Sequence, residues 1–216
     1  MKKATATVFN PGEMKRLDVF ISRVAAAEPL PGGGSVAALA GELAAALGEM
    51  MAGLTEDREK FLPVRTEVLE IHAKLKSLRN MLQRLVQEDS IAYKSLLDAI
   101  KLPRNTGKQK TARARAIRRA MRGATETPLR TARLLVEVLK CLKILIEIGN
   151  PNVKCDAAVG AQLACASLNG TQYNVLANIS RMTDASYASR SHMEISGLVR
   201  KGRMILQRVD RLMAKA

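Results

Sequence analysis

Apolar residues recur at steps of three and four along most of the chain, which is the spacing of one face of an α-helix. The longest series has the steps 4-3-4-3-4-3 and consists of Val64, Val68, Ile71, Leu75, Leu78, Leu82 and Leu85. Such a seam is typical of a helix packed along its length against other helices. It predicts one helix from Pro63 to the break at Leu102-Pro103, with a length on the order of 60 Å at 1.5 Å per residue.

The segment before this seam combines an apolar stripe with small residues. The stripe consists of Val36, Leu39, Leu43, Leu47, Met50 and Leu54, and the small residues between them are Gly41, Ala45, Gly48 and Ala52. The pattern predicts a helix with one apolar face. The small residues let another helix approach it closely.

Shorter periodic segments complete the pattern. Helices are predicted over 14–27, over a basic segment after the loop 104–109, and over 129–148, 153–181 and 184–216. Pro128 should start a new helix or kink the old one. No strand pattern, repeat or linker is present. The prediction is therefore an all-α, single-domain (1–216), up-and-down multi-helix bundle with long helices. Its long seam and its Gly/Ala-rich helix expose enough apolar surface to predict a homodimer.

Composition agrees with a helical core. Hydrophobic residues make up 47% of the 216 residues, but aromatic residues only 3%, with no Trp. No apolar run approaches the ~20 residues of a membrane span, and the N-terminal Lys pair precedes no apolar signal-peptide region. The three cysteines form no CxxC pair. We therefore expect a reduced, cytoplasmic protein with buried thiols, no membrane segment and no metal site.

The charge is strongly positive and unevenly placed. The formal net charge is +15, and the tract from Arg104 to Arg122 holds eight Lys or Arg and no acid. A solvated helix face is one interpretation of this tract. A docking surface for a polyanion, either nucleic acid or a polyglutamylated cofactor, is the other. Aromatic stacking residues are nearly absent and no helix-turn-helix spacing is evident, which disfavours a non-enzymatic nucleic-acid-binding bundle.

Asp89 is the first candidate for chemistry, because it stands four residues after Leu85, where the seam requires an apolar residue. A carboxylate on a core stripe is costly unless it is paired or hydrogen-bonded. The spacing alone leaves two alternatives open. Asp89 is either a functional carboxylate or a structural one that is partly exposed or paired with a neighbouring helix.

The second candidate is the turn Pro31-Gly32-Gly33-Gly34-Ser35 at a helix start. Consecutive glycines let a ligand approach the backbone, and the free N–H groups of a helix N-terminus favour an anion or a carbonyl edge. The turn lacks the Gly-Lys-Ser/Thr ending of a Walker motif. Taken alone, it is also compatible with a simple turn.

The third candidate is a small and polar face within 153–181. At steps of three and four this face carries Asp156, Gly160, Leu163, Ser167, Gly170, Asn174, Asn178 and Arg181. A solvent face usually carries Lys and Glu, and this one has neither. We interpret it as a cavity-lining face, with a solvent face as the alternative.

Five blocks of sequence around these candidates resemble one known family. In chain order they are Pro31-Gly32-Gly33-Gly34-Ser35-Val36-Ala37-Ala38-Leu39-Ala40-Gly41, Asp89-Ser90-Ile91-Ala92-Tyr93 with Leu102-Pro103-Arg104-Asn105-Thr106, Pro128-Leu129, Gly149-Asn150-Pro151-Asn152-Val153-Lys154-Cys155-Asp156, and Tyr173-Asn174-Val175-Leu176-Ala177-Asn178 with Thr183-Asp184. The family is that of formiminotetrahydrofolate cyclodeaminase and methenyltetrahydrofolate cyclohydrolase. The blocks occur in family order and span residues 15–190.

The resemblance implies an all-α homodimeric enzyme that acts on a tetrahydrofolate derivative, with or without a polyglutamate tail, and needs no other cofactor. Cyclodeaminases close 5-formiminotetrahydrofolate to 5,10-methenyltetrahydrofolate and release ammonia. Cyclohydrolases interconvert the methenyl and 10-formyl forms. The glycine-rich start and the segment 173–184 look slightly closer to cyclodeaminases, so this activity is the first prediction. A cyclohydrolase is the alternative, and an inactive structural member of the family is a further one.

The resemblance also implies roles for individual residues. Asp89 matches the catalytic acidic residue. The implied substrate-binding residues are Gly32, Gly33, Gly34, Ser35, Arg104, Asn150, Asp156, Asn174 and Asn178. Of these we expect all except Arg104 to approach one cleft, with Asp89 in or beside it. Arg104 stands where Lys is usual, and Cys155 replaces a usual Ser or Thr. Because no formiminotransferase domain precedes these blocks, a separate formiminotransferase is an expected partner.

Overall fold

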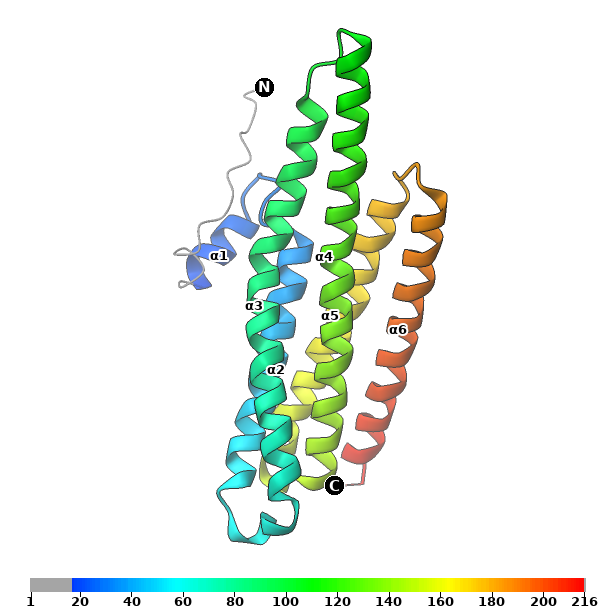
Figure 1. The fold of residues 1–216 in the computed structure, drawn as a ribbon. Coiled ribbons are helices and arrows are strands. Elements are labelled where there is room, and N and C mark those ends of the chain that lie inside the picture. The colour runs from blue at the N-terminus through cyan, green and yellow to red at the C-terminus, as the bar shows by residue number, and fades with distance from the viewer. Residues whose placement is uncertain (1–16, 216) are drawn as a thin grey trace.

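The computed structural model describes residues 17–215, and within this range the chain forms helices and no strand. The α-helices are α1 (Leu17–Val24), α2 (Gly33–Glu56), α3 (Arg65–Lys101), α4 (Gly107–Ile148), α5 (Lys154–Ile179) and α6 (Ala185–Met213). Two 3₁₀ turns, η2 (Glu59–Val64) and η3 (Pro151–Val153), connect them. Figure 1 shows the long helices running up and down beside one another. The predicted all-α bundle is confirmed.

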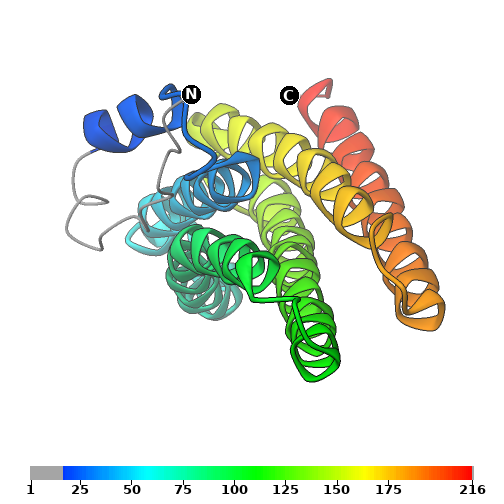
Figure 2. The same ribbon diagram turned by 90° about the horizontal axis from the view of Figure 1, so that it is seen from above.

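Four helices pack on one another at the centre of the bundle, and α6 adds the buried Ile195, Val199 and Val209 to their core. Helices α2, α3, α4 and α5 pack on one another, and α6 packs against α4 and α5. The view from above shows α1 and α6 on opposite sides of this core (Figure 2). Helix α1 lies within the predicted helix 14–27, whose residues 14–16 fall outside the described range. Of the three cysteines, Cys141 and Cys165 are buried as expected, whereas Cys155 is exposed.

The predicted seam of α3 is confirmed. Val68, Leu75, Leu82 and Leu85 are fully buried along one face of this helix, which at 1.5 Å per residue is about 55 Å long. The face is interrupted after Val86, where Ser90 rather than a large apolar side chain is the next buried residue before Leu96 and Ala99. Asp89 therefore lies where the apolar seam gives way to polar residues.

Helix α2 differs from the simple expectation of one apolar face. Its buried residues are mostly small and include Ala38, Gly41, Ala45, Gly48 and Ala52. A Cβ on Gly41 would lie 2.5 Å from Leu135 Cδ2, so the neighbouring helices pack against the α2 backbone itself. The predicted apolar stripe consequently points outward, and Val36, Leu43, Met50 and Leu54 are 39% to 48% exposed.

Helix α2 is an exception to the prediction that no segment is long and apolar enough to span a membrane. By length and composition alone it is apolar enough, with a mean hydropathy of 1.3 in its best window. Its small-residue face is packed inside the bundle, and a core helix passes the same composition test.

Helix α4 continues through Pro128 instead of starting anew there, contrary to one of the two expectations. Proline has no N–H, so the carbonyl of Ala124, four residues earlier, loses its donor within the helix. Asn178 Nδ2 on α5 donates to this carbonyl at 2.8 Å. A side chain from the neighbouring helix thus replaces the missing helical hydrogen bond.

Candidate active site

A cleft of about 290 Å³ opens at the end of the bundle where α2 begins. Its walls come from all four core helices and from the segment before α2. The lining residues are Pro29, Leu30, Gly32, Gly33, Gly34, Asp89, Tyr93, Ala124, Asn174, Ala177, Asn178 and Arg181. Asp89 is the only carboxylate among them.

Ser35 in the first turn of α2 holds the Asp89 carboxylate. Ser35 Oγ donates to Asp89 Oδ2 at 3.1 Å, and the Ser35 backbone N–H also donates to this carboxylate. The same hydroxyl lies 3.2 Å from Ser90 Oγ, and both serines are fully buried. Asp89 therefore accepts hydrogen bonds at the start of the neighbouring helix α2. The residue before this helix is Gly32, which has no side chain to cap the first turn.

Gly34 is required by the position of Asp89. A Cβ built on Gly34 would lie 2.1 Å from Asp89 Oδ1 and 2.5 Å from its carboxyl carbon. No side chain fits between α2 and α3 at this point. The glycine-rich start thus lets a carboxylate on α3 approach the α2 backbone. The glycines therefore do more than allow the chain to turn.

The environment of Asp89 raises its pKa. Burial disfavours the charged carboxylate and is the main cause, while the hydrogen bonds from the Ser35 hydroxyl and N–H act in the opposite direction. The resulting pKa lies above the ordinary aspartate value. A raised pKa brings the carboxyl group closer to the range in which it can both donate and accept a proton.

Helix α5 supplies the opposite wall with one face of its last turns. Asn174 and Asn178 lie on α5, and Arg181 follows just after its end at Ile179. Asn174 Oδ1 lies 3.8 Å from the Cβ position of Gly33, so it faces the start of α2. Asn178 donates to Ala124 O, which leaves its Oδ1 to accept a hydrogen bond in the cleft. This wall offers amide donors and acceptors with one cation at the end.

The bond between Asn178 and Ala124 gives a testable expectation for stability. Asn178→Ala removes the donor from a carbonyl that Pro128 has already deprived of its helical partner, and we expect a loss of about 1–3 kcal/mol in the free energy of unfolding. In a Pro128→Ala background, residue 128 regains an N–H for this carbonyl, so the same change should cost much less.

A double-mutant cycle measured by chemical denaturation checks this coupling. Asn174→Ala, one turn earlier on α5, is the matched control and should cost the same in both backgrounds. Equal costs of Asn178→Ala with and without Pro128 would show that the hydrogen bond does not compensate for the proline.

Of the residues implied by the resemblance, the structure brings Gly32, Gly33, Gly34, Asn174 and Asn178 into the cleft with Asp89. Ser35 lies directly behind them. Asn150, Asp156 and Arg104 do not line this cleft within one chain, and their part in substrate binding stays a prediction.

Each of these three residues has another position. Asn150 joins the far end of α2, where its N–H donates to Thr55 Oγ1 and its Nδ2 to Leu54 O, both at 3.1 Å. The 24 residues of α2 place this end about 35 Å from the cleft. Asp156 lies in the first turn of α5, also at that end, and Arg104 is exposed in the connection between α3 and α4.

The predicted cavity-lining face of α5 is correct only in its last turns. Further down, Gly160 packs against α2, since its Cβ position lies 3.1 Å from Ala44 O. Ser167 is buried and donates its hydroxyl to Ala37 O. The small residues there allow α5 and α2 to pack closely, and no cavity separates them.

Tyr93 lines the cleft but was not among the predicted site residues. It follows Asp89 by four residues, so helical spacing from Asp89 would have identified it. Arg181 lines the cleft as the predicted cavity-lining face implies, although no binding role was assigned to it.

Comparisons with known proteins show what the chain is similar to over most of its length. Residues 16–197 match the model of a family described as formiminotransferase-cyclodeaminase. A methenyltetrahydrofolate cyclohydrolase of Methylorubrum extorquens is 33% identical over 193 residues, which cover 89% of this chain and 93% of that protein. A formimidoyltransferase-cyclodeaminase of Mus musculus is 32% identical over 184 residues. The match covers 85% of this chain but only 34% of the mouse protein, so this chain corresponds to about a third of it.

A solved structure shares the fold over nearly its whole length. It is the formiminotetrahydrofolate cyclodeaminase from Thermotoga maritima, with a TM-score of 0.84 and 26% sequence identity. The similarity covers 93% of this chain and 96% of that chain.

Proposed function

The chain belongs to the formiminotransferase-cyclodeaminase family, and we propose that it makes or breaks the one-carbon bridge between N5 and N10 of a tetrahydrofolate derivative. The observation that carries the proposal is Asp89, the one carboxylate lining the cleft, held by Ser35 against the glycine-rich start of α2. The raised pKa of Asp89 supports a role in moving a proton at the bridge.

The first candidate reaction is that of a cyclodeaminase. N10 of 5-formiminotetrahydrofolate attacks the formimino carbon and forms the second carbon–nitrogen bond of the bridge. The formimino group enters as its protonated amidinium form, so attack by N10 leaves an –NH2 group on the bridge carbon. The proton that N10 loses must reach this amino group, which then leaves as ammonia when its bond to carbon breaks and leaves the bridge as a cation. Asp89 accepts the first proton and donates to the leaving nitrogen, so one carboxyl group serves both steps. Its negative charge also stabilises the cationic bridge.

The second candidate is a cyclohydrolase, which is favoured by the relative from Methylorubrum extorquens that matches over almost its full length. Water adds to the methenyl carbon, the bond from this carbon to N5 breaks, and 10-formyltetrahydrofolate results. Asp89 takes a proton from the attacking water and delivers it to N5, and the second proton of the water is released as the formyl C=O forms. The same carboxylate position supports either reaction.

Two assays on one preparation test the proposal. Formation of the methenyl form from 5-formiminotetrahydrofolate is followed by absorbance beside ammonia release, and hydrolysis of the methenyl form is followed in the reverse direction. We expect turnover in at least one assay, and the larger kcat/KM identifies the reaction. Absence of turnover and of folate binding in both assays would exclude the proposed function.

The walls of the cleft suggest how the substrate is held. Asn174 and Asn178 offer amide groups to the polar edge of a pterin ring, and the first N–H groups of α2 offer donors to a carbonyl oxygen. We propose that these groups orient the ring so that N5 and N10 face Asp89. Apart from this substrate, no cofactor is needed for the proton transfers described.

We also propose a homodimer, because the outward stripe of α2 is a contiguous apolar surface on a described helix. Val36, Leu43, Met50 and Leu54 recur along it, and Val159 on the adjacent α5 is 54% exposed. Such a surface is typical of an interface rather than of a solvent face.

Leu43→Glu tests this interface by placing a charge at the centre of the stripe. We expect the wild type to sediment as a dimer at micromolar concentration and the variant as a folded monomer. Met204→Glu is the matched control, since Met204 is 54% exposed on α6, away from the stripe, and should leave the dimer intact. A monomeric wild type would contradict the proposal.

The remaining proposals follow from the same activity. The chain acts as one helical domain in the cytoplasm. A separate formiminotransferase supplies 5-formiminotetrahydrofolate if the cyclodeaminase reaction is the correct one.

A further inference from the structure

A buried hydroxyl group lies behind the Asp89 carboxylate, and the mechanism described above does not use it. It belongs to Ser90, the next residue on α3, which is fully buried and does not line the cleft. Serine and threonine hydroxyls within helices often donate to the carbonyl oxygen four residues earlier, as Thr125 does to Met121 O at 2.9 Å. The Ser90 hydroxyl instead contacts a neighbouring helix, because its partner within the described residues is Ser35 Oγ at 3.2 Å.

Three groups in this contact share two hydroxyl hydrogens, which fixes the direction of the hydrogen bonds. An ionised carboxylate can only accept, so Ser35 Oγ must donate its hydrogen to Asp89 Oδ2, 3.1 Å away. The Ser35 oxygen is then left to accept, and Ser90 is the donor. With Asp89 ionised, the hydrogen bonds therefore run from Ser90 to Ser35 to Asp89.

Protonation of Asp89 at Oδ2 reverses this order. The carboxyl O–H then donates to Ser35 Oγ, and the Ser35 hydroxyl turns to donate to Ser90 Oγ. The Ser90 hydrogen becomes available to the carbonyl oxygen of Val86, four residues earlier on α3. Each hydroxyl hydrogen thus has an acceptor in both protonation states of Asp89, so neither state leaves a buried donor unsatisfied.

The two states depend on Ser90 to different degrees. Without its hydroxyl, the ionised state keeps the hydrogen bond from Ser35 to Asp89 and loses only a donor to the Ser35 oxygen. The protonated state loses the acceptor for the Ser35 hydrogen, and an unsatisfied buried donor costs more than an unused lone pair. Ser90 therefore stabilises the protonated form of Asp89 more than the ionised form.

Among the residues that the structure describes, no charged group takes part in this arrangement. The raised pKa of Asp89 results from burial, opposed by the two hydrogen bonds from Ser35, and not from a neighbouring charge. The other ionisable side chains that line the cleft are Tyr93 on α3 and Arg181 after the end of α5. Within residues 17–215, α2 and α4 contribute no ionisable side chain to this lining.

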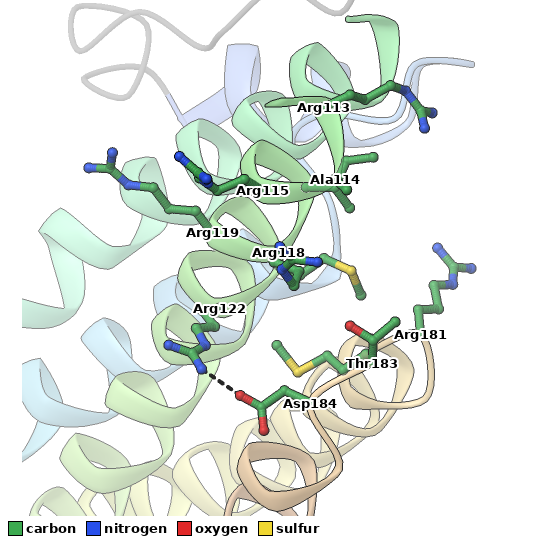
Figure 3. A pocket seen from close by; sticks show the side chains of 12 residues that line it. Arg113, Ala114, Arg115, Arg118, Arg119, Arg122, Arg181, Thr183 and Asp184 are labelled. Atoms are coloured by element: carbon green, nitrogen blue, oxygen red, sulfur yellow. Dashed lines mark hydrogen bonds and ion pairs between the residues drawn. The ribbon is translucent and has the colours of Figure 1, made fainter. Parts of the chain in front are cut away.

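Charges beside the cleft are paired or face another hollow. Glu88, which precedes Asp89 on α3, is paired with Arg130 on α4. The basic residues of the first half of α4 lie along an adjacent hollow of about 530 Å³, which reaches to the connection from α5 to α6 (Figure 3). There Arg122 is paired with Asp184. A substitution behind the cleft leaves all these charges in place.

We propose that Ser90 is a positioning residue that acts through Ser35, and that the two hydroxyl groups form a hydrogen-bond chain whose direction reverses each time Asp89 gains or loses its proton. Such a chain lets one buried carboxyl group serve first as base and then as acid without a rearrangement of the helices. The proposal rests on the folate function proposed above only for the use of that proton, because the chain itself is a property of the free protein.

The titration of Asp89 in the ligand-free protein tests this chain, followed by the chemical shift of its carboxyl carbon in protein labelled with carbon-13 aspartate. Ser90→Ala should lower the pKa of Asp89, with an acid dissociation constant increased about fivefold or more. Ser95→Ala is the matched control on the same helix, because the Ser95 hydroxyl is exposed and donates to Ile91 O, and it should leave the titration unchanged. In a Ser35→Ala background, Ser90→Ala should have no effect, since the link to Asp89 is already absent.

Two further readouts separate this role from a purely structural one. By linkage, Ser90→Ala should lower the thermal midpoint more at acidic pH than at pH values above the pKa of Asp89, because the protonated form loses more. In a protein that turns over a folate substrate, the pH profile of kcat should move in the same direction as the titration.

An unchanged or raised pKa of Asp89 in folded Ser90→Ala protein would overturn the proposal. An equal effect of Ser90→Ala with and without the Ser35 hydroxyl would do the same, because Ser90 would then not act through Ser35. A titration that shifts as expected in a protein without turnover would support the chain and reject the proposed reaction. Failure of the chain is therefore distinguishable from failure of the proposed function.

Discussion

Asp89→Asn should lower kcat by about 10²–10⁴-fold, the usual contribution of general acid–base catalysis, while the protein stays folded. Asparagine keeps the shape of the side chain, and its Oδ1 can still accept the hydrogen bond from the Ser35 hydroxyl. It cannot carry a proton between N10, or water, and the departing group. The loss should thus appear in kcat, with KM changed much less.

Stability should respond to this substitution in a direction fixed by the raised pKa of Asp89. A carboxyl group with a higher pKa in the folded than in the unfolded protein favours folding while it is protonated, and this contribution is lost as pH rises through the folded pKa. At acidic pH, Asp89→Asn and wild type should therefore melt at similar temperatures. At pH values above the folded pKa of Asp89, where the wild type holds a partly buried charge, the variant should melt at the same or a higher temperature.

Turnover and the thermal midpoint are measured on the same preparation over a series of pH values. Asp98→Asn is the control, because Asp98 lies on the same helix but is exposed and paired with Lys94, and it should leave turnover unchanged. A folded Asp89→Asn protein with wild-type kcat would remove Asp89 from the mechanism. A large loss of stability with normal turnover per folded molecule would make it structural.

The sequence predicted α3 and the position of Asp89 well, for a physical reason. A seam of large apolar residues at steps of three and four can be buried only along one face, so its continuation identifies Asp89 as an exception. The helix that contacts Asp89 through Ser35 could not be identified in this way. The resemblance, and not the spacing, connected the glycine-rich start of α2 with the carboxylate.

The outward stripe of α2 shows where pattern reading fails. Leu43 and Met50 are more hydrophobic than Ala38 or Gly48, so hydrophobicity alone assigns the larger residues to the core. In the structure the small residues are buried, because they allow the shortest distance between helix backbones. Periodicity identifies an apolar face, but it does not say whether the same chain or a second copy covers it.

Asn150 and Asp156 show a different limit. They belong to blocks that occur in family order, yet α4 and α5 run in opposite directions and place these residues at the far end of the bundle. Order along the chain contains no information on which end of a helix lies near the cleft. Asn174 and Asn178, about five turns further along α5, reach the cleft because α5 returns toward the start of α2.

Gly34→Ala should also abolish most of the activity, through position rather than chemistry. The added Cβ would lie 2.1 Å from Asp89 Oδ1, so the carboxylate must leave Ser35 or the two helices must separate. Overpacking of this kind costs typically about 1–3 kcal/mol, and a carboxylate that is displaced by even an ångström loses about 100-fold in rate. We expect a lower thermal midpoint and a fall in kcat of about 100-fold or more.

Two further variants separate the clash from a general effect of alanine. Gly170→Ala on α5 is the control, since nothing lies within 4 Å of its Cβ position, and it should be neutral or slightly stabilising without affecting turnover. The double variant Gly34→Ala/Asp89→Ala removes the carboxylate that meets the new methyl group. It should regain much of the thermal midpoint lost in Gly34→Ala but none of the activity. Removing the carboxylate would then restore stability but not activity, because Gly34 provides the space in which the Asp89 carboxylate acts. Normal turnover in a folded Gly34→Ala protein would contradict this account of the glycine-rich start.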